Sequence, residues 1–238
     1  IEGYKTLKCD FHTHTIFSDG TIMPEERVWE GNRRGLDAIA ITEHIEYRPH
    51  NSFIKADHNE SYKIAKGVEK NANIIVIPGA EITRNKPLGH LNALFLKDAN
   101  AFDIHGVYNQ TYRTDRQYGP MTIVFARERS IEGIKEALFA HRSVVKFGDM
   151  LIGSENNLKA LMKACLSYKI KPVKGNEAIM EISNKSTLSF YLQLDNKTIS
   201  ILGSDYTEFK VRLDDKIKFT NMFITDNCQL EIDIPELK

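Results

Sequence analysis

The chain has 238 residues, 42% of them hydrophobic, which is enough for one large domain or for one domain with a smaller neighbour. Its 32 basic residues balance 32 acidic residues, so net charge gives no attraction to nucleic acid or membranes, and such an attraction would require a local patch. A run of about 18 apolar residues is absent, which argues against a transmembrane helix. The three cysteines (Cys9, Cys165 and Cys228) form no CxxC pair, which argues against a disulfide framework or a thiolate zinc site.

The first half of the sequence alternates between strand and helix patterns. The first predicted helix begins at Pro24 and is closed by Gly35, as helix-end chemistry favours. In chain order we expect a strand over 6–14, a helix over 24–34, strand 38–42, helix 61–71, strands 74–78, 91–96 and 121–126, and a helix over 131–142. This alternation predicts an α/β fold with a parallel sheet or barrel.

The last third of the sequence has a different pattern. After a helix that includes 158–166, short runs of alternating polar and apolar residues begin at about residue 168. Such runs, separated by turn residues, are typical of a small antiparallel β-sandwich. We therefore expect an α/β domain over 1–150, a linking helix within 151–167 and a β-sandwich domain over 168–238.

Histidine and carboxylate side chains gather where the predicted strands end. His12 and His14 are two residues apart, so on a strand they point to the same face. The other members are Asp19, His44, Glu81, His90, Asp103 and His105. In parallel β/α folds the carboxyl ends of the strands form one face, so we expect these residues to converge there.

The residue types in this cluster indicate a metal centre. A single histidine is more often a structural residue than a ligand, but here five of the eight histidines lie at strand ends near carboxylates. Imidazole and carboxylate without thiolate suit Zn, Mn or Fe as divalent ions. Two or three such ions would activate a hydroxide and clamp the oxygens of a phosphate ester. The sequence contains neither a Gly-rich phosphate loop nor a Ser-His-Asp pattern that would favour another chemistry.

Five ordered motifs resemble those of the PHP (polymerase and histidinol phosphatase) family over roughly residues 5–147. They are DFHTHTIFSDG (10–20), ITEHIEY (41–47), IPGAEIT (77–83), GHLNAL (89–94) and FDIHG (102–106). The resemblance implies a distorted (β/α)7 barrel, a metal cluster that is commonly trinuclear, and phosphoester hydrolysis. It implies that His12, His14, His44, Glu81, His90, Asp103 and His105 are metal ligands. It further implies that Asp19 binds or orients a metal and that Glu81 bridges two ions.

The sequence departs from the family pattern at two places. Glu43 stands where the second motif usually has Asp; because the ligand is the neighbouring His44, we expect little effect. Only a short segment separates His90 from Asp103, although the family has further strand–helix units and another histidine there. One βαβ unit takes about 30 residues, so we expect an incomplete barrel and hypothesise that a stretch is missing at this point. The third metal site depends on that stretch.

Substrate contacts are predicted in two loops. Arg48 and His50 follow the second motif, where they either line the substrate entrance or are solvated loop residues. Arg113 and Arg116 follow the FDIHG motif, and a guanidinium there can hold a phosphate through two hydrogen bonds. We expect Asp19 and Arg113 to act in catalysis on a small phosphomonoester or phosphodiester; nucleic acid is not indicated.

Two other interpretations stay open. An amidohydrolase-like enzyme that cleaves a C–N bond also uses HxH and Asp ligands, but it typically needs a strand lysine, whereas Lys55 and Lys86 lie in loop-like sequence. The alternative is a degenerate, non-catalytic metal-binding module. We expect the C-terminal domain to be dispensable for metal binding. The chain begins at Ile1, so either a cytoplasmic location or export after removal of a leader fits it.

Overall fold

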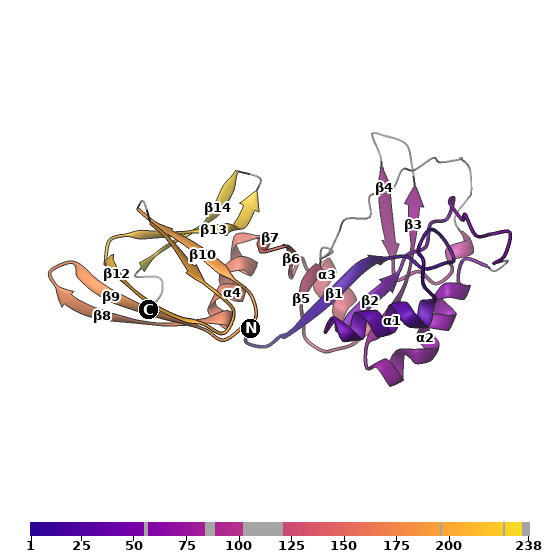
Figure 1. Ribbon diagram of the computed structural model, residues 1–238, viewed down its shortest axis with the longest axis horizontal. Helices are drawn as coiled ribbons and strands as arrows, with labels where there is room; N and C mark the ends of the chain where they lie inside the picture. Colours follow the sequence, from indigo (N-terminus) through magenta and orange to yellow (C-terminus); the bar gives the residue numbers. More distant parts are fainter. Residues whose placement is uncertain (55–56, 84–88, 102–120, 196, 226, 235–238) are drawn as a thin grey trace. The chain divides into compact units, whose positions relative to one another are not determined.

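The computed structural model describes the chain except residues 55–56, 84–88, 102–120, 196, 226 and 235–238 (Figure 1). The chain forms two compact units, one of Tyr4–Arg142 and one of Ser143–Lys238 with Ile1–Gly3. No helix within the described ranges combines the length and the apolarity that crossing a membrane requires.

The N-terminal unit is built on a mixed sheet with the strand order β5-β1-β2-β3-β4. Its strands are β1 (Lys5–Thr13), β2 (Ala38–Ile41), β3 (Ile75–Thr83), β4 (His90–Leu94) and β5 (Met121–Ala126). The helices are α1 (Pro24–Arg33), α2 (Glu60–Ala72), the 3-10 helix η1 (Ala99–Ala101) and α3 (Ile131–Phe139). The expected strand–helix alternation is therefore present in this unit.

Helices cover both faces of this sheet because β2 sends apolar side chains to each side. Ile39 and Ile41 pack with Val28 of α1 and Ala65 of α2 in one buried cluster. The intervening alanines of β2 pack in a second cluster with Ile134 of α3. Figure 1 shows α1 and α2 next to each other, as their mutual packing requires. All four residues of β2 are buried, which accounts for its uninterrupted apolar sequence.

The directions of the strands differ in part from the expected parallel arrangement. β1, β2 and β3 are parallel, whereas β4 is antiparallel to β3 and β5 is antiparallel to β1. Only six residues separate Thr83 from His90, and a parallel connection needs a dozen or more, so β4 returns antiparallel. Strand pairing among the described residues does not join β4 to β5, and the barrel stays a prediction.

The C-terminal unit contains two sheets and one helix. Its elements are β6 (Ser143–Phe147), β7 (Met150–Gly153), α4 (Glu155–Cys165), β8 (Leu166–Lys174), β9 (Glu177–Asn184), β10 (Phe190–Leu194), β11 (Lys197–Ile201), β12 (Tyr206–Arg212), β13 (Lys216–Thr225) and β14 (Cys228–Asp233). The sheet β12-β9-β8 is antiparallel, as expected for this region. The other has the order β11-β10-β13-β7-β6, with β14 beside β13, and it includes one parallel pair, β13 with β7.

Helix α4 packs within the C-terminal unit, against β6, β7, β8, β13 and β14. Its buried side chains are Leu158, Leu161, Met162 and Cys165, which form a single apolar stripe. The helix predicted within 151–167 therefore contributes to the core of this unit. The predicted domain boundaries, 1–150 and 168–238, stay predictions, because the packing of compact units does not show which residues carry a function.

Candidate metal centre

The carboxyl ends of β1, β2 and β3 bring the central histidines and acids together. His14 follows β1 directly, His44 lies just beyond β2, and Glu81 is within β3. The backbones of His44 and Glu81 form a parallel bridge. The amide of Glu81 donates to the carbonyl of Glu43 at 2.9 Å, and the amide of Ile45 donates to the carbonyl of Glu81 at 3.0 Å. The histidine of the second motif is thereby held beside the acid of the third.

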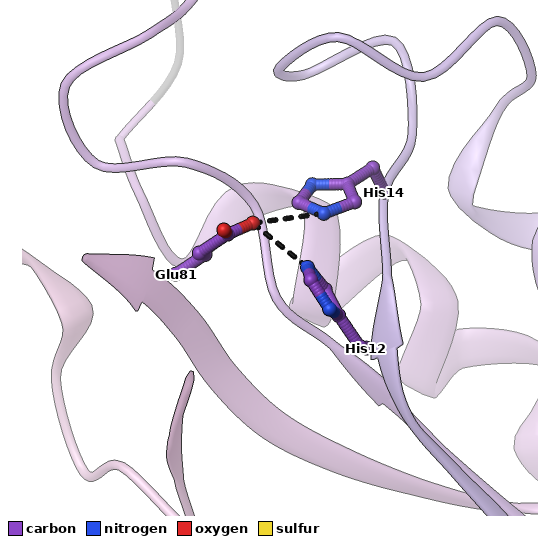
Figure 2. Close-up of side chains that lie close together, drawn as sticks. All are labelled: His12, His14 and Glu81. Carbon is purple, nitrogen blue, oxygen red and sulfur yellow. Dashed lines mark hydrogen bonds and ion pairs between the residues drawn. The ribbon is translucent and has the colours of Figure 1, made fainter. Parts of the chain in front are cut away.

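The carboxylate of Glu81 lies at the centre of the cluster, and its side chain is 1% exposed. Its Oε2 is 2.8 Å from Nε2 of His12 and 3.0 Å from Nε2 of His14, and Figure 2 shows both rings turned toward it. Nδ1 of His44 is 3.5 Å from the same oxygen. Oε1 instead pairs with Nδ1 of His90. The two oxygens of one carboxylate thus face different histidines.

A second acid, Asp19, faces His44 from the loop after β1. Its Oδ2 is 3.1 Å from Nε2 of His44, and its Oδ1 is 3.4 Å from Nδ1 of His14. The other ring nitrogen of His44 lies 2.7 Å from the hydroxyl oxygen of Thr83. Nδ1 of His14 is also 3.3 Å from the hydroxyl oxygen of Ser18. Both imidazoles therefore place Nδ1 beside a hydroxyl group and Nε2 beside a carboxylate.

The loop that carries Asp19 folds tightly back on the end of β1. The amide of Gly20 donates to the carbonyl of Thr15 at 2.9 Å. A Cβ at position 20 would lie 2.6 Å from the carbonyl carbon and oxygen of His14, so only glycine fits this turn. Nε of Arg27 in α1 donates to that same carbonyl oxygen at 3.1 Å. The Gly that follows the motif acid is explained by this close approach.

The acids and the imidazoles shift one another's pKa values. Burial by itself raises the pKa of Glu81, but hydrogen bonds from His12 and His14 and the charge of His44 outweigh it, so the pKa is far below its ordinary value. Burial also raises the pKa of Asp19, and the hydrogen bond from His44 and the charge of His14 lower it overall. Burial alone would lower the pKa of His44, yet its hydrogen bond to Asp19 and the charge of Glu81 raise it.

Among the residues that the structure describes, three groups of side chains have the geometry to hold a divalent ion. They are His12, His14 and Glu81; His14, Asp19 and His44; and His44, Glu81 and His90. In each group the ligand atoms lie within 4.8 Å of one another. A mixed set of imidazole nitrogens and carboxylate oxygens fits Zn²⁺, Mn²⁺ or Fe²⁺. The residues present therefore fit a cluster of divalent ions.

Six of the predicted ligands converge in this centre: His12, His14, Asp19, His44, Glu81 and His90. Asp103, His105, Arg113 and Arg116 lie outside the described residues. Nε of Arg48 donates to the carbonyl of Phe17 at 3.3 Å, in the loop that carries Asp19. His50 is half-buried in the loop after His44, where its carbonyl accepts from the amides of Phe53 and Ile54. Substrate contact by Arg48, His50, Arg113 and Arg116 stays a prediction.

The sequence interpretation missed three polar side chains that contact the centre or support it. The hydroxyl of Thr83 lies beside Nδ1 of His44, and the hydroxyl of Ser18 lies beside Nδ1 of His14. Glu43, which we took to be of little effect, is 5% exposed and accepts hydrogen bonds from Thr15 and Ser18. The position of Glu43 between two buried apolar segments was the available sequence signal for its role. A charge in such a position requires hydrogen-bonding or charged partners.

A comparison with protein families agrees with these motifs. Residues 10–105 match the family model of the PHP domain. This part of the chain is therefore PHP-like. An uncharacterised protein of Methanocaldococcus jannaschii is 40% identical over 83 residues. Those residues make up 34% of this chain and only 36% of that relative.

The likeness to one solved structure extends beyond residues 10–105 and covers 98% of this chain. That solved structure is the crystal structure of a two-domain protein from Bacteroides vulgatus, described as containing a predicted PHP-like metal-dependent phosphoesterase. The identity is 26% and the TM-score is 0.85, over 98% of this chain and 95% of that one. This chain and that solved protein therefore both consist of a PHP-like unit and a second unit.

Proposed function

We propose that this chain is a metal-dependent phosphoesterase whose active centre is the cluster around Glu81. The observation that carries the proposal is that both oxygens of one buried carboxylate face imidazoles, Oε2 toward His12 and His14 and Oε1 toward His90. Such an acid can bridge two ions. Similarity to a predicted PHP-like phosphoesterase in Bacteroides vulgatus supports the same conclusion.

The described residues supply enough ligands for two ions bridged by Glu81. A neutral imidazole offers one lone pair while its other nitrogen carries a proton, so His14 and His44 each serve one ion. The three overlapping groups share these two residues and Glu81, and they cannot all be filled at once. We therefore propose one ion held by His12, His14 and Glu81 and a second held by His44, Glu81 and His90. A third ion requires further ligands, for which Asp103 and His105 are our proposed source.

Divalent ions at this position would acidify a water molecule and polarise the phosphoryl oxygens of a bound ester. The side chains of this centre would hold the ions and fix their positions. The side chain of Glu81 is almost fully buried and that of Asp19 is 4% exposed, so water competes little for either carboxylate. His12 is 48% exposed, which leaves one side of the cluster open to a substrate. A small phosphomonoester or phosphodiester is the substrate class that we propose.

The test begins with chelator-treated protein, to which Mn²⁺, Zn²⁺ or Fe²⁺ is added. Turnover of p-nitrophenyl phosphate and bis(p-nitrophenyl) phosphate is measured beside an anilide substrate of similar size. We expect metal-dependent release of nitrophenol, a fall of at least about 100-fold in Glu81→Gln, and little anilide cleavage. Metal-dependent cleavage of the anilide alone would replace this proposal with the amidohydrolase alternative.

A matched pair of variants distinguishes the effect of losing a proposed metal ligand from the effect of losing any histidine. His12→Asn removes a proposed ligand, and His141→Asn removes a histidine elsewhere in the same unit. His141 has φ of 55°, in the left-handed region that asparagine adopts readily, so this control should fold. We expect His141→Asn to retain activity and His12→Asn to lose it. Bound metal without turnover of either phosphoester would indicate a non-catalytic module instead.

A further inference from the structure

Glu43 is a buried acid that belongs to none of the three candidate metal groups, although it precedes His44 directly. Both of its carboxylate oxygens accept from the backbone amide of Thr15, at 3.1 Å each. Oε1 also accepts from the hydroxyl of Thr15, and Oε2 accepts from the hydroxyl of Ser18. Thr15 and Ser18 are both 0% exposed, so water does not compete for these bonds. Glu43, just beyond β2, thus holds the loop after β1 in place through these hydrogen bonds.

The fastened loop contacts the metal ligands at two points. Ser18 directly precedes Asp19, and its Oγ is 3.3 Å from Nδ1 of His14. A serine hydroxyl has a single proton, and Glu43 is a closer acceptor than Asp19, whose Oδ1 is 3.4 Å away. With that proton directed to Glu43, the free lone pairs of Ser18 accept from an Nδ1–H of His14. Nε2 of His14, 3.0 Å from Glu81, then keeps its lone pair for a metal ion.

We propose that Glu43 is a positioning residue that acts through Ser18, holding His14 in the Nδ1–H tautomer and Asp19 beside His44. The proposal rests on the metal centre proposed above, and it assigns this centre a supporting shell that includes Thr15. In this proposal Glu43 is not itself a metal ligand, because among the described residues its hydrogen-bond donors, Thr15 and Ser18, both belong to the loop. Its effect is on the affinity and geometry of its neighbours.

Glu43→Gln tests this anchor with a side chain of nearly the same size. Both carboxylate oxygens of Glu43 accept hydrogen bonds, and in glutamine an NH₂ group replaces one of them. Whichever way the amide is turned, its NH₂ group therefore faces another hydrogen-bond donor. Asp37→Asn is the matched control. Asp37 lies immediately before the other end of β2 and likewise accepts from a backbone amide, that of Lys8 at 3.0 Å, and from a side chain, Arg129 at 3.1 Å.

Metal affinity is measured by titration of chelator-treated protein with Mn²⁺ and Zn²⁺. We expect Glu43→Gln and Ser18→Ala each to weaken binding roughly 10- to 100-fold, and Asp37→Asn to leave it unchanged. Because Glu43 acts through Ser18, the double variant should bind about as weakly as the weaker single variant. Parent-like affinity in Glu43→Gln, additive losses in the double variant, or an equal loss in Asp37→Asn would each overturn the proposal.

A measurement that does not depend on catalysis keeps this proposal separate from the proposed function. The ¹⁵N resonances of the His14 ring, recorded on the Zn²⁺-loaded protein at mildly alkaline pH, report its tautomer whether or not the protein hydrolyses anything. We expect Nδ1–H in the parent and a reduced Nδ1–H population in Ser18→Ala, even if Glu43→Gln fails to fold. An Nε2–H ring in the parent would refute the role of Glu43, whereas an inactive parent with the expected tautomer would refute only the phosphoesterase activity.

Discussion

Glu81 and His90 lie on neighbouring antiparallel strands, β3 and β4, and the imidazole of His90 pairs through Nδ1 with Oε1 of Glu81. The opposite oxygen of that carboxylate faces His12 and His14. The antiparallel return of the chain after Thr83 therefore gives the second oxygen of the carboxylate its imidazole partner. Each oxygen of Glu81 thus faces a histidine of a different candidate metal group.

Replacement of His90 should remove one ion and leave another. In His90→Asn, Oε1 of Glu81 loses its imidazole partner while His12, His14 and Oε2 are untouched. We expect the stoichiometry measured by elemental analysis to fall by about one ion per chain, with the remaining affinity changed by less than about tenfold. Loss of all bound metal would show instead that His90 supports the entire cluster.

Acid should destabilise the metal-free protein because of its depressed carboxyl pKa values. The pKa values of Glu81 and Asp19 are lowered in the folded state from ordinary values of 4.5 and 3.8. Each therefore contributes stability that is present above its ordinary value and is lost as pH falls through the folded value. Below about pH 4 we expect a decrease in the urea concentration at the unfolding midpoint of chelator-treated protein. This decrease should be less steep in Glu81→Gln.

Alkali should act on the same protein through His44. Its pKa is raised from 6.5, so its contribution is fully present below 6.5 and is lost as pH rises through the folded value. The metal-free protein should thus be most stable at mildly acidic pH. Divalent ions need unprotonated imidazoles, so added Zn²⁺ should move the stability maximum to higher pH. A maximum that stays in place when metal is added would contradict metal binding by His44.

Two glycine-to-alanine substitutions should have opposite effects on stability. A Cβ at Gly20 would meet the carbonyl group of His14 at 2.6 Å, so Gly20→Ala should lower the free energy of unfolding by about 1–3 kcal/mol and weaken metal binding. Gly67 lies inside α2 with nothing within 4 Å of its added Cβ. Gly67→Ala should therefore stabilise the protein by about 0.5–1 kcal/mol. Chemical denaturation measures both, and a neutral Gly20→Ala would contradict the folded-back loop.

His58 provides a test of where the guanidinium of Arg48 lies. Burial, and then the positive charge of Arg48, lower the pKa of His58 below its ordinary value of 6.5. NMR titration of the metal-free protein should show His58 titrating below 6.5, and Arg48→Gln should move its pKa upward. An unchanged titration in the variant would place the guanidinium away from His58.

Much of this centre was predictable because its residue types are locally patterned. Two histidines two residues apart on a strand, and acids or histidines just after apolar runs, indicate one rim of an α/β sheet. His12, His14, His44 and Glu81 follow that rule, whereas Asp19 lies in the loop after β1 and His90 begins β4. The direction of β4 was not recognised from its composition, and the short link after Thr83 was the relevant signal. The helix at 155–165 was expected, but periodicity could not indicate which unit its apolar stripe would join.

By itself the sequence determined which side chains are available for metal chemistry and on which strands they lie, because hydrophobic periodicity sets the local structure. Only the tertiary structure decided how each ligand is oriented. Glu81 faces imidazoles from three different segments, and Glu43 reaches a loop 25 residues away to hold Ser18. Such pairings depend on strand register and loop closure between residues distant in the chain, which no local pattern encodes.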